Sequence, residues 1–462
     1  MAPISIVSVF DQCQVSPPPT ATIGDTSLVM NYMDISHLTR FPIHLLFFYQ
    51  LPALTKTHFL KTIVPNLKRS LSITLQHFPP MAGNIIVYPP TSSTIKPEIR
   101  YVKGDSVKVT FAECNNLDFN YLTGYHPRNC DKFYHLIPPL GDYARISDYM
   151  KIPVFAFQVT LFPNCGISIG MTFHHSVGDA STLFCFLNAW TSIAQFGTDE
   201  SFLADGTNIP FYGRVINNPP ELDAFLSRVT KVETLFGEAY QPPKLCGPTD
   251  RIRATFLLPR TMIDQLKKTV SIQLPTLSYV SSFIVTCAYI WCCLAKALKD
   301  DDRQLFVIPV DARTRLDPPI SATYFGNCLN MCVTHAITNL LKENDGFITA
   351  VKLIGENLYD MLNDKEGILK INTPEEVRTQ GMPKTMIAIS GTPKLRFHDM
   401  DFGCGKPKKV ETISNDYGLS VSIEAGKESN QDMEISISLM PAQMEAFVTA
   451  FNQELPKTIL SD

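Results

Sequence analysis

Long apolar runs are scarce in this sequence, and so are the signs of export. Its apolar runs are all well short of the roughly 20 residues that a helix needs to cross a bilayer. The N-terminus, MAPISIVSVFDQCQVSPPP, has no basic stretch before its apolar residues and carries an acid, Asp11. These features predict a cytoplasmic chain with neither a signal peptide nor a membrane span.

Patterns typical of metal sites and of nucleic-acid binding are also missing. None of the 12 cysteines forms a CxxC pair, and no histidine pair accompanies Cys328 and Cys332, so the sequence indicates no zinc site. Many cysteines lie in apolar stretches such as TCAYIWCCLAKAL (286–298), which predicts reduced, buried thiols in a reducing compartment. The net charge is −4 and no stripe of lysine and arginine occurs, which argues against a nucleic-acid partner.

What the sequence does contain is the patterning of a globular α/β protein. With 462 residues, of which 45% are hydrophobic and 18% charged, the chain can bury a sizeable core and is long enough for two domains. Strand-like and helix-like patterns alternate in both halves, whereas residues 197–250 lose this periodicity. We therefore expect two domains of mixed sheets flanked by helices, at 1–205 and 251–462, joined by a crossover loop at 206–250.

Periodicity also predicts individual elements, and one hairpin leads to the candidate site. Residues 97–114 are expected to form two strands joined by a turn at Gly104 and Asp105. A hairpin is expected at 154–162 and 167–175, and a helix follows it, so that FHHSVGDAST (173–182) connects a strand to a helix. The other predicted elements are helices at 55–78, 180–196, 260–270, 279–298 and 344–362 and from Pro441, strands at 253–259 and 433–440, and a strand with its exit loop at 304–315.

Two of the 10 histidines are adjacent in this connection, His174 and His175. A histidine between a strand and a helix lies where many α/β proteins bind ligands, and imidazole is the natural general base at neutral pH. We interpret His175 as a base that activates an incoming hydroxyl for direct transfer. Asp179 either touches the substrate or imidazole or, as we favour, caps the following helix and pairs with Arg313 or Arg315 from the other half.

Spacing alone leaves two other interpretations of the histidine pair open. The pair could be a core histidine followed by a turn, with no chemical role. A metal site made of His174, His175 and Asp179 is weaker, because adjacent strand residues point to opposite faces. We therefore expect no metal, and we expect His174 to point away from the reaction centre as a packing or hydrogen-bonding residue.

A second motif, DMDFGCGKPKK (399–409), carries a family resemblance. Together with HxxxD (175–179) it resembles the BAHD acyltransferases of plants, whose signatures are HxxxD and DFGWG. YFGNC (324–328), VPNLKRSLSITLQHF (64–78) and GYHPRNCDKFYH (124–135) are similar to the branch that acylates anthocyanins and other phenolic glycosides, notably the malonyltransferases of the daisy family. The likeness runs from end to end of the chain.

The resemblance implies two chloramphenicol-acetyltransferase-like domains that meet along a tunnel, entered by acyl-CoA from one side and by the acceptor from the other. His175 is then the base, the acyl group passes directly within a ternary complex, and Asp179 points away from the substrate. Acyl-CoA is a co-substrate, no cofactor is permanently bound, and we expect a monomer. The resemblance implies CoA or acyl contacts for Ser281, Ser282, Thr392, Lys394 and the position of Leu183, and a structural loop for Asp401, Gly403, Cys404 and Gly405.

Two departures from the family pattern affect the loop and the donor. Cys404 stands where DFGWG has tryptophan, and losing a large buried aromatic costs about 3–5 kcal/mol unless the space is refilled. We expect weaker packing of this loop but an intact base. Some malonyl-using relatives have an arginine at the position of Leu183, and no lysine or arginine occurs between 152 and 213. Because a buried malonyl carboxylate needs a cation, either Lys384 or Lys394 supplies it or the donor is neutral.

The sequence thus predicts transfer of an acyl group, malonyl ahead of others, from acyl-CoA to a hydroxyl of an anthocyanin, flavonoid or other phenolic glycoside. A neutral donor, acetyl-CoA or hydroxycinnamoyl-CoA, is the alternative within this chemistry. A non-catalytic ligand-binding descendant is suggested by Cys404 but opposed by the intact His175 and Asp179. A metal-dependent hydrolase that uses the histidine pair is the remaining hypothesis.

Overall fold

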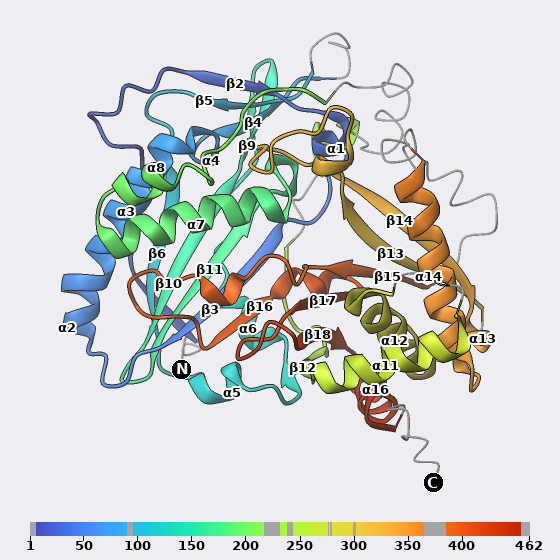
Figure 1. Ribbon diagram of the computed structural model, residues 1–462. Coiled ribbons are helices and arrows are strands. Elements are labelled where there is room, and N and C mark those ends of the chain that lie inside the picture. The colour runs from blue at the N-terminus through green and yellow to red at the C-terminus, as the bar shows by residue number, and fades with distance from the viewer. Residues whose placement is uncertain are drawn as a thin grey trace.

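The computed structural model describes residues 6–89, 96–216, 232–237, 244–275, 277, 280–298, 302–364 and 385–453, and Figure 1 shows two lobes lying side by side. The strands of the first half are β1 (Val7–Val15), β2 (Thr26–Val29), β3 (Ile43–Gln50), β4 (Asn84–Val87), β5 (Glu98–Tyr101), β6 (Val107–Cys114), β7 (Arg128–Asn129), β8 (Ala144–Ile146), β9 (Tyr149–Pro153), β10 (Phe155–Phe162) and β11 (Gly166–Phe173). Its helices are α1 (Tyr32–Ile35), α2 (Lys56–His58), α3 (Val64–His77), α4 (Pro79–Ala82), α5 (Phe119–Thr123), α6 (Asp131–Tyr134), α7 (Ala180–Phe196) and α8 (Glu200–Asp205).

The second half alternates in the same way. Its strands are β12 (Ile252–Leu258), β13 (Arg303–Asp311), β14 (Leu329–Ile337), β15 (Thr385–Ser390), β16 (Lys409–Thr412), β17 (Ser420–Ala425) and β18 (Met433–Leu439). Its helices are α10 (Val232–Leu235), α11 (Arg260–Gln273), α12 (Ser282–Ala297), α13 (Thr338–Lys342), α14 (Gly346–Asn363) and α16 (Pro441–Gln453). The expectation of mixed sheets flanked by helices is confirmed.

Each lobe is built on one large sheet that contains both parallel and antiparallel pairs. The six-stranded sheet has the order β1-β6-β10-β11-β3-β16, and the seven-stranded sheet has the order β14-β13-β15-β17-β18-β12-β7. A smaller sheet, β2-β5-β4-β9-β8, lies at the top of the first lobe (Figure 1). Helix α7 packs on the first large sheet through ring contacts such as Trp190 against Phe157, whose centroids are 4.8 Å apart.

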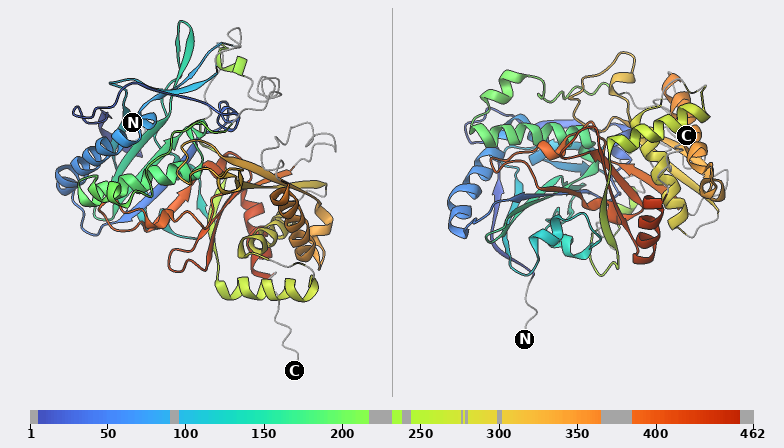
Figure 2. Two further views of the ribbon diagram at one scale, coloured as in Figure 1. Left: turned by 45° about the horizontal axis from the view of Figure 1, so that its top comes forward. Right: turned by 60° about the horizontal axis from the view of Figure 1, so that its bottom comes forward.

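The two lobes exchange strands. β16, from the C-terminal half, pairs with β3 in the first sheet, and β7, from the N-terminal half, pairs with β12 in the second. Figure 2 shows the C-terminal segment, in red, reaching into the blue and green lobe. Arg128 on β7 and Glu411 on β16 join the exchanged strands through a fully buried ion pair of 2.6 Å. The domain bounds at 205 and 251 stay a prediction, and any such division cuts across these shared sheets.

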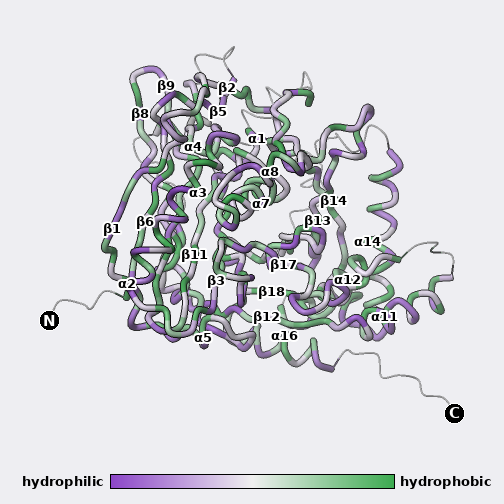
Figure 3. Tube along the Cα trace, turned by 60° about the vertical axis from the view of Figure 1, so that its left-hand side comes forward, coloured by the Kyte–Doolittle hydropathy of each residue, from purple (hydrophilic) through white to green (hydrophobic). Residues whose placement is uncertain are grey.

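The hairpin that leads to the site formed as its pattern predicted. β10 and β11 are antiparallel, Phe155 lies opposite Phe173, and every residue of both strands is buried. The next helix, α7, spans 180–196 as predicted and ends at Gly197, whose φ of +75° suits glycine. Figure 3 colours α7 as largely hydrophobic, as expected of a helix enclosed between layers.

Two sequence predictions need correction. The strands within 97–114 do form, but β5 belongs to the small sheet and β6 to the six-stranded sheet, so the turn at Gly104 and Asp105 joins two sheets and does not close a hairpin. The helix predicted over 55–78 is interrupted by a π-helical stretch at Phe59–Ile63 before α3. Both errors have one cause, because local periodicity does not reveal which sheet a strand joins or where a helix widens.

The described part of the crossover, residues 206–216, 232–237 and 244–250, contributes little regular structure. Within the described ranges, none of the helices combines the length and the apolar character that a membrane span requires.

Candidate active site

The two histidines lie just past the end of β11, where the chain makes one short 3-10 turn, His175–Val177, before α7 begins. His174 closes this turn: its Nδ1 accepts a hydrogen bond from the backbone N–H of Ser176 at 3.3 Å, and the residue is buried. Burial, and then the neighbouring ring, lower the pKa of His174 to about 3, so it is neutral at physiological pH. His174 therefore has the environment of a packing residue, and His175 stays the candidate base.

The ring of His175 is enclosed on one side. It stacks on the ring of His37, with centroids 3.8 Å apart and an angle of 2° between the planes. Its Nδ1 is buried, whereas the residue as a whole is only partly buried. Burial lowers the pKa of His175, and its own carbonyl oxygen and Asp179 oppose that shift. Among the described residues Nδ1 has no hydrogen-bond partner, and Nε2 is the nitrogen of the neutral ring that is left to accept a proton from a ligand.

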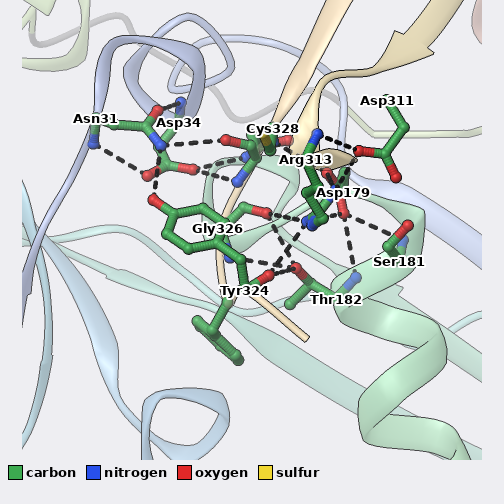
Figure 4. Close-up of polar contacts among 12 residues, drawn as sticks. Asn31, Asp34, Asp179, Ser181, Thr182, Asp311, Arg313, Tyr324, Gly326 and Cys328 are labelled. Carbon is green, nitrogen blue, oxygen red and sulfur yellow. Dashed lines mark hydrogen bonds and ion pairs between the residues drawn. The ribbon is translucent and has the colours of Figure 1, made fainter. Parts of the chain in front are cut away.

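Asp179 is held through both carboxylate oxygens (Figure 4). Its Oδ1 accepts hydrogen bonds from the N–H groups of Ser181 and Thr182, both at 3.1 Å, which makes Asp179 the N-cap of α7. Arg313 donates to Oδ2 at 2.8 Å and to Oδ1 at 3.0 Å, and the N–H of Cys328 donates to Oδ2 at 3.0 Å. A carboxylate with five donors is committed to structure, and here it fastens α7 of one lobe to two loops of the other.

Arg313 extends this network and Arg315 does not join it. Arg313 is buried and also donates to the carbonyls of Tyr324 and Gly326, both at 3.1 Å. Arg315 is exposed and donates to the carbonyl of Asp311 at 2.6 Å. Of the two arginines named from the sequence, only Arg313 reaches Asp179.

Asn327, the fourth residue of YFGNC, reaches the base from the other lobe. Its Nδ2 donates to the carbonyl of His175 at 2.8 Å and to Oδ1 of Asp34 at 3.0 Å, and its backbone N–H donates to the same carboxylate oxygen at 2.7 Å. Asn31 completes the chain, because its N–H donates to Asp34 at 3.0 Å and its Nδ2 donates to the carbonyl of Asn327 at 3.1 Å. These contacts fix the backbone of the residue whose ring is the candidate base.

The residues implied for CoA contacts lie in two other places. Ser281 caps α12, with its Oγ accepting the N–H of Ile284 at 3.1 Å, and Ser282 is the first residue of that helix. Oγ1 of Thr392 accepts the N–H of Lys394 at 3.3 Å, and the Lys394 side chain is exposed. The hydroxyls of Ser281 and Thr392 have local structural partners, and a role of the four residues in CoA binding stays a prediction.

The acyl position named from the family pattern, Leu183, is buried in the first turn of α7 at 1% exposure. An apolar side chain there supplies no charge for a donor carboxylate. Lys384, one of the two lysines suggested in its place, lies outside the described residues.

The DFGCG loop is a tight turn closed by its own aspartate. Oδ1 of Asp401 accepts the N–H groups of Gly403 at 2.8 Å and Cys404 at 2.9 Å. Gly403 and Gly405 have φ angles of +85° and +82°, a region that residues with a Cβ rarely adopt. The two glycines of the motif are therefore needed for the path of the backbone.

This loop lies at the opposite end of α7 from Asp179. Gln195 donates to the carbonyl of Asp401 at 2.8 Å, and Phe402 packs on Trp190 with ring centroids 4.9 Å apart. The helix has 17 residues, so roughly 25 Å separates its two ends at 1.5 Å per residue. The loop is too distant to touch a group reacting at His175.

A cavity of about 360 Å³ borders the loop. Its walls include Phe402, Gly403, Cys404 and Asn66, together with residues 51–54, 58, 62 and 63. Cys404 therefore borders this cavity and is only partly buried. Burial, and then Asp401, raise the pKa of Cys404 to about 11, which keeps its thiol protonated and unreactive.

One further motif needs to be set aside. Residues 166–170 read GISIG and so have the letters of the GxSxG pattern, in which a nucleophilic serine stands on a sharp turn between strand and helix. Ser168 lies instead in the middle of β11, fully buried between Thr160 on β10 and Phe48 on β3. Its position excludes it as an acyl acceptor.

A match to a protein-family signature identifies the family of this chain. The sequence signature of the Transferase family matches residues 15–454, almost the whole chain. This chain belongs to the BAHD family of acyl-CoA-dependent acyltransferases. Within the described ranges, no three His, Cys, Asp or Glu side chains are grouped so that they could hold a metal ion.

Similar proteins include curated plant enzymes and solved structures. The BAHD chain is 48% identical to a malonyl-coenzyme A:anthocyanin 3-O-glucoside-6''-O-malonyltransferase of Dahlia pinnata, over 98% of this chain and 99% of that one. It is 38% identical to an anthocyanin 5-O-glucoside-6'''-O-malonyltransferase of Salvia splendens, over 97% and 95%. The crystal structure of vinorine synthase shares the fold, with a TM-score of 0.67 and 19% identity over 95% of this chain and 96% of that one.

Local sequence patterns do not identify four residues around the candidate base of this BAHD enzyme, which cap, form or follow α1: Asn31, Asp34, His37 and Arg40. They stand in NYMDISHLTR (31–40), more than 130 residues before His175, and no spacing rule connects them with HxxxD. The signal that could have found part of this group was the capping box of α1, in which Asn31 and Asp34 bond each other's backbone. Asn327 was noted in the sequence only as part of YFGNC, and no role was predicted for it.

Proposed function

We propose that this BAHD acyltransferase transfers a malonyl group from malonyl-CoA to a sugar hydroxyl of an anthocyanin or other phenolic glycoside, with His175 as the general base. The observation that carries the proposal is a neutral imidazole where the two lobes meet, with its backbone held by Asn327 and the following loop held through Asp179. The named activities of the Dahlia and Salvia relatives support malonyl as the donor group and a glucoside as the acceptor.

The reaction follows from the placement of His175. Nε2 accepts the proton of the sugar hydroxyl as its oxygen attacks the thioester carbonyl, a C–O bond forms and the carbonyl electrons move onto oxygen. The tetrahedral intermediate then collapses, the C–S bond breaks, and the departing thiolate takes the proton from the imidazolium. A positioned general base of this kind contributes roughly 10²–10⁴ in rate. A ring whose pKa is lowered by burial returns its proton readily to the leaving group.

Asp179 and Asn327 serve this reaction as positioning residues. Asp179 sets the start of α7 and, through Arg313, the contact between the lobes. Asn327 sets the backbone of the base. Neither has to touch the substrate for its loss to lower the rate.

We further propose the co-substrate, the compartment and the oligomeric state of the enzyme. Acyl-CoA is a co-substrate, and the chemistry needs no permanently bound cofactor. All 12 cysteines lie in described residues and are free thiols, which supports a reducing compartment such as the cytoplasm. We expect a monomer, which size-exclusion chromatography with light scattering would test.

A neutral donor is the second candidate, because Leu183 carries no charge where some malonyl-using relatives have arginine. The experiment that decides is a donor screen on the purified chain. Malonyl-CoA, acetyl-CoA and p-coumaroyl-CoA are each paired with a panel of anthocyanin and flavonoid glucosides, and released thiol and product mass are recorded. Turnover with malonyl-CoA is expected. Turnover with neutral donors alone would replace malonyl as the assigned donor group. No turnover with any donor would favour the hypothesis of a non-catalytic ligand-binding protein.

A further inference from the structure

Arg40 is a cation beside the base, and it pairs with no acid in the part of the chain that the structure describes. It follows α1, and its backbone N–H donates to the carbonyl of His37 at 3.1 Å, so the two residues share one turn. The ring of His37 lies flat on that of His175 at 3.8 Å. The backbone of Arg40 therefore lies one turn from the residue that stacks on the candidate base.

Arg40 is accessible to solvent and yet partly desolvated by the protein around it. The residue is exposed, yet burial lowers the pKa of its guanidinium, and no neighbouring acid opposes that shift. Both observations hold for a side chain that is crowded by protein on most sides and open on one. Burial is the largest cause that lowers the pKa of His37 and of His175. The charge of Arg40 adds to the lowering of both pKa values, so the guanidinium and the two rings interact electrostatically.

An unpaired cation at this place is unfavourable unless something complements it. It disfavours the imidazolium that the base must become in the reaction, and its own desolvation is not offset by an acid. A ligand carboxylate would satisfy the guanidinium with charge-assisted, two-pronged hydrogen bonds and would remove the repulsion at the base.

We propose that Arg40 binds the free carboxylate of the malonyl donor and so sets the preference for malonyl-CoA over neutral acyl-CoA. The inference rests on the proposed function and deepens it. In a malonyl thioester a single methylene separates the carboxylate from the carbonyl that is attacked, so the cation that holds the carboxylate has to lie within a side chain's reach of the base. Arg40 stands on the turn whose histidine stacks on the base, and its charge acts on both rings, whereas Leu183 has no charge and the backbone of Lys394 belongs to a turn with Thr392.

Donor binding then also strengthens the base. A carboxylate on Arg40 cancels the field that acts on His175, so the pKa of the imidazole rises toward its ordinary value while the malonyl group is bound. The acidic limb of the kcat profile therefore lies at higher pH with malonyl-CoA than with acetyl-CoA. In Arg40→Gln the two limbs coincide, a readout that a merely structural role of Arg40 would not produce.

The test compares donors on wild type and four variants with one glucoside acceptor. Arg40→Gln is expected to lower kcat/KM for malonyl-CoA roughly 10- to 100-fold, the effect of losing one charged hydrogen-bonding group, and to change that for acetyl-CoA less than threefold. Arg40→Lys keeps the charge and retains part of the preference. Arg260→Gln, which removes an exposed arginine on α11, is the matched control and keeps the wild-type donor ratio. Lys394→Gln tests the competing cation.

The outcomes separate the inference from the function on which it rests. Equal losses for both donors in a folded Arg40→Gln or Arg40→Lys enzyme, or a donor ratio that changes in Lys394→Gln and not in Arg40→Gln, would overturn the role of Arg40 alone. A wild-type enzyme that uses acetyl-CoA and ignores malonyl-CoA would overturn the proposed donor as well. Thermal melting of each variant shows whether it is folded.

Discussion

The two ends of α7 are organised in opposite ways. At its N-terminal end every oxygen of Asp179 is bonded, and Arg313, which is 134 residues away in the sequence, closes the contact between the lobes. At its C-terminal end the DFGCG loop borders a cavity of about 360 Å³ beside Cys404. The first end depends on buried charge and cannot lose a partner without leaving another charge unpaired, whereas the second depends on packing and has already lost a large side chain.

The largest effect is expected from breaking the charged end. Arg313→Met leaves Asp179 buried without its partner, and removing one member of a buried pair typically costs about 3–5 kcal/mol of unfolding free energy. Denaturant unfolding followed by fluorescence measures this. Arg315→Met, which removes an exposed arginine from the same turn, should change stability by less than about 0.5 kcal/mol. Similar values for the two variants would contradict the role given to the Asp179 network.

The second-largest effect is expected from acid, which should lower the stability of the same end of α7. His44 lies on β3, where its Nδ1 is hydrogen-bonded to Thr172 of β11, two residues before His174. Burial lowers the pKa of His44 and His174 to about 3, against 6.5 in the unfolded chain, so the unfolded state alone takes up their protons as the pH falls below about 6.5. At pH 5 each histidine then lowers stability by about 2 kcal/mol, and the loss continues toward pH 3. Unfolding at pH 7 and pH 5 tests this, with His174→Gln as the comparison. A pH dependence that is the same in wild type and His174→Gln would count against it.

The charged end also shows which parts of the site could be predicted from the sequence. HxxxD, the hairpin before it and helix 180–196 were predictable, because alternation, helical spacing and an N-cap aspartate are local patterns. Arg313 was foreseeable only as one of two arginines, since DARTR does not say which side chain turns inward. His37, Arg40 and Asp34 were not foreseeable, because their contacts with the site arise from tertiary packing across more than 130 residues.

The other end was foreseen differently. The replacement of tryptophan by Cys404 predicted poorer packing of the loop, and this stays a prediction for a residue that borders the cavity. What the sequence could not provide is the distance between this loop and the base, which depends on which end of α7 each motif meets. The exchange of β7 and β16 between the lobes was also beyond local patterns, since short strands carry no label of the sheet they join.

A smaller effect, on catalysis, is expected from Asn327→Ala. Removing the donor to the His175 carbonyl loosens the base, and we expect kcat to fall roughly 10-fold, with the KM for acyl-CoA nearly unchanged. Steady-state kinetics over a pH series measure kcat and KM separately, and the acidic limb of the kcat profile should shift together with the fall in kcat. Asn363→Ala, an exposed asparagine on α14, serves as the control. A change confined to KM would assign Asn327 to substrate binding.

The smallest effect is expected from refilling the packing end. Cys404→Trp should raise stability by about 0.5–2 kcal/mol, as cavity-filling substitutions commonly do, and leave kcat within about twofold. Cys404→Ala enlarges the cavity and should lower stability by about 1 kcal/mol. Loss of stability in Cys404→Trp would mean that the neighbours have closed around the smaller residue, and a large change in kcat would mean that the loop and the base are coupled along α7.

The most direct test of the account is the rate of malonyl transfer by His175→Gln. With malonyl-CoA and an anthocyanidin 3-O-glucoside, free thiol and malonylated product are measured for wild type and variant, and acyl-CoA binding is measured by calorimetry. The account predicts a loss of 10²–10⁴ in rate with acyl-CoA binding retained. A variant that keeps its rate within about threefold of wild type would contradict His175 as the base.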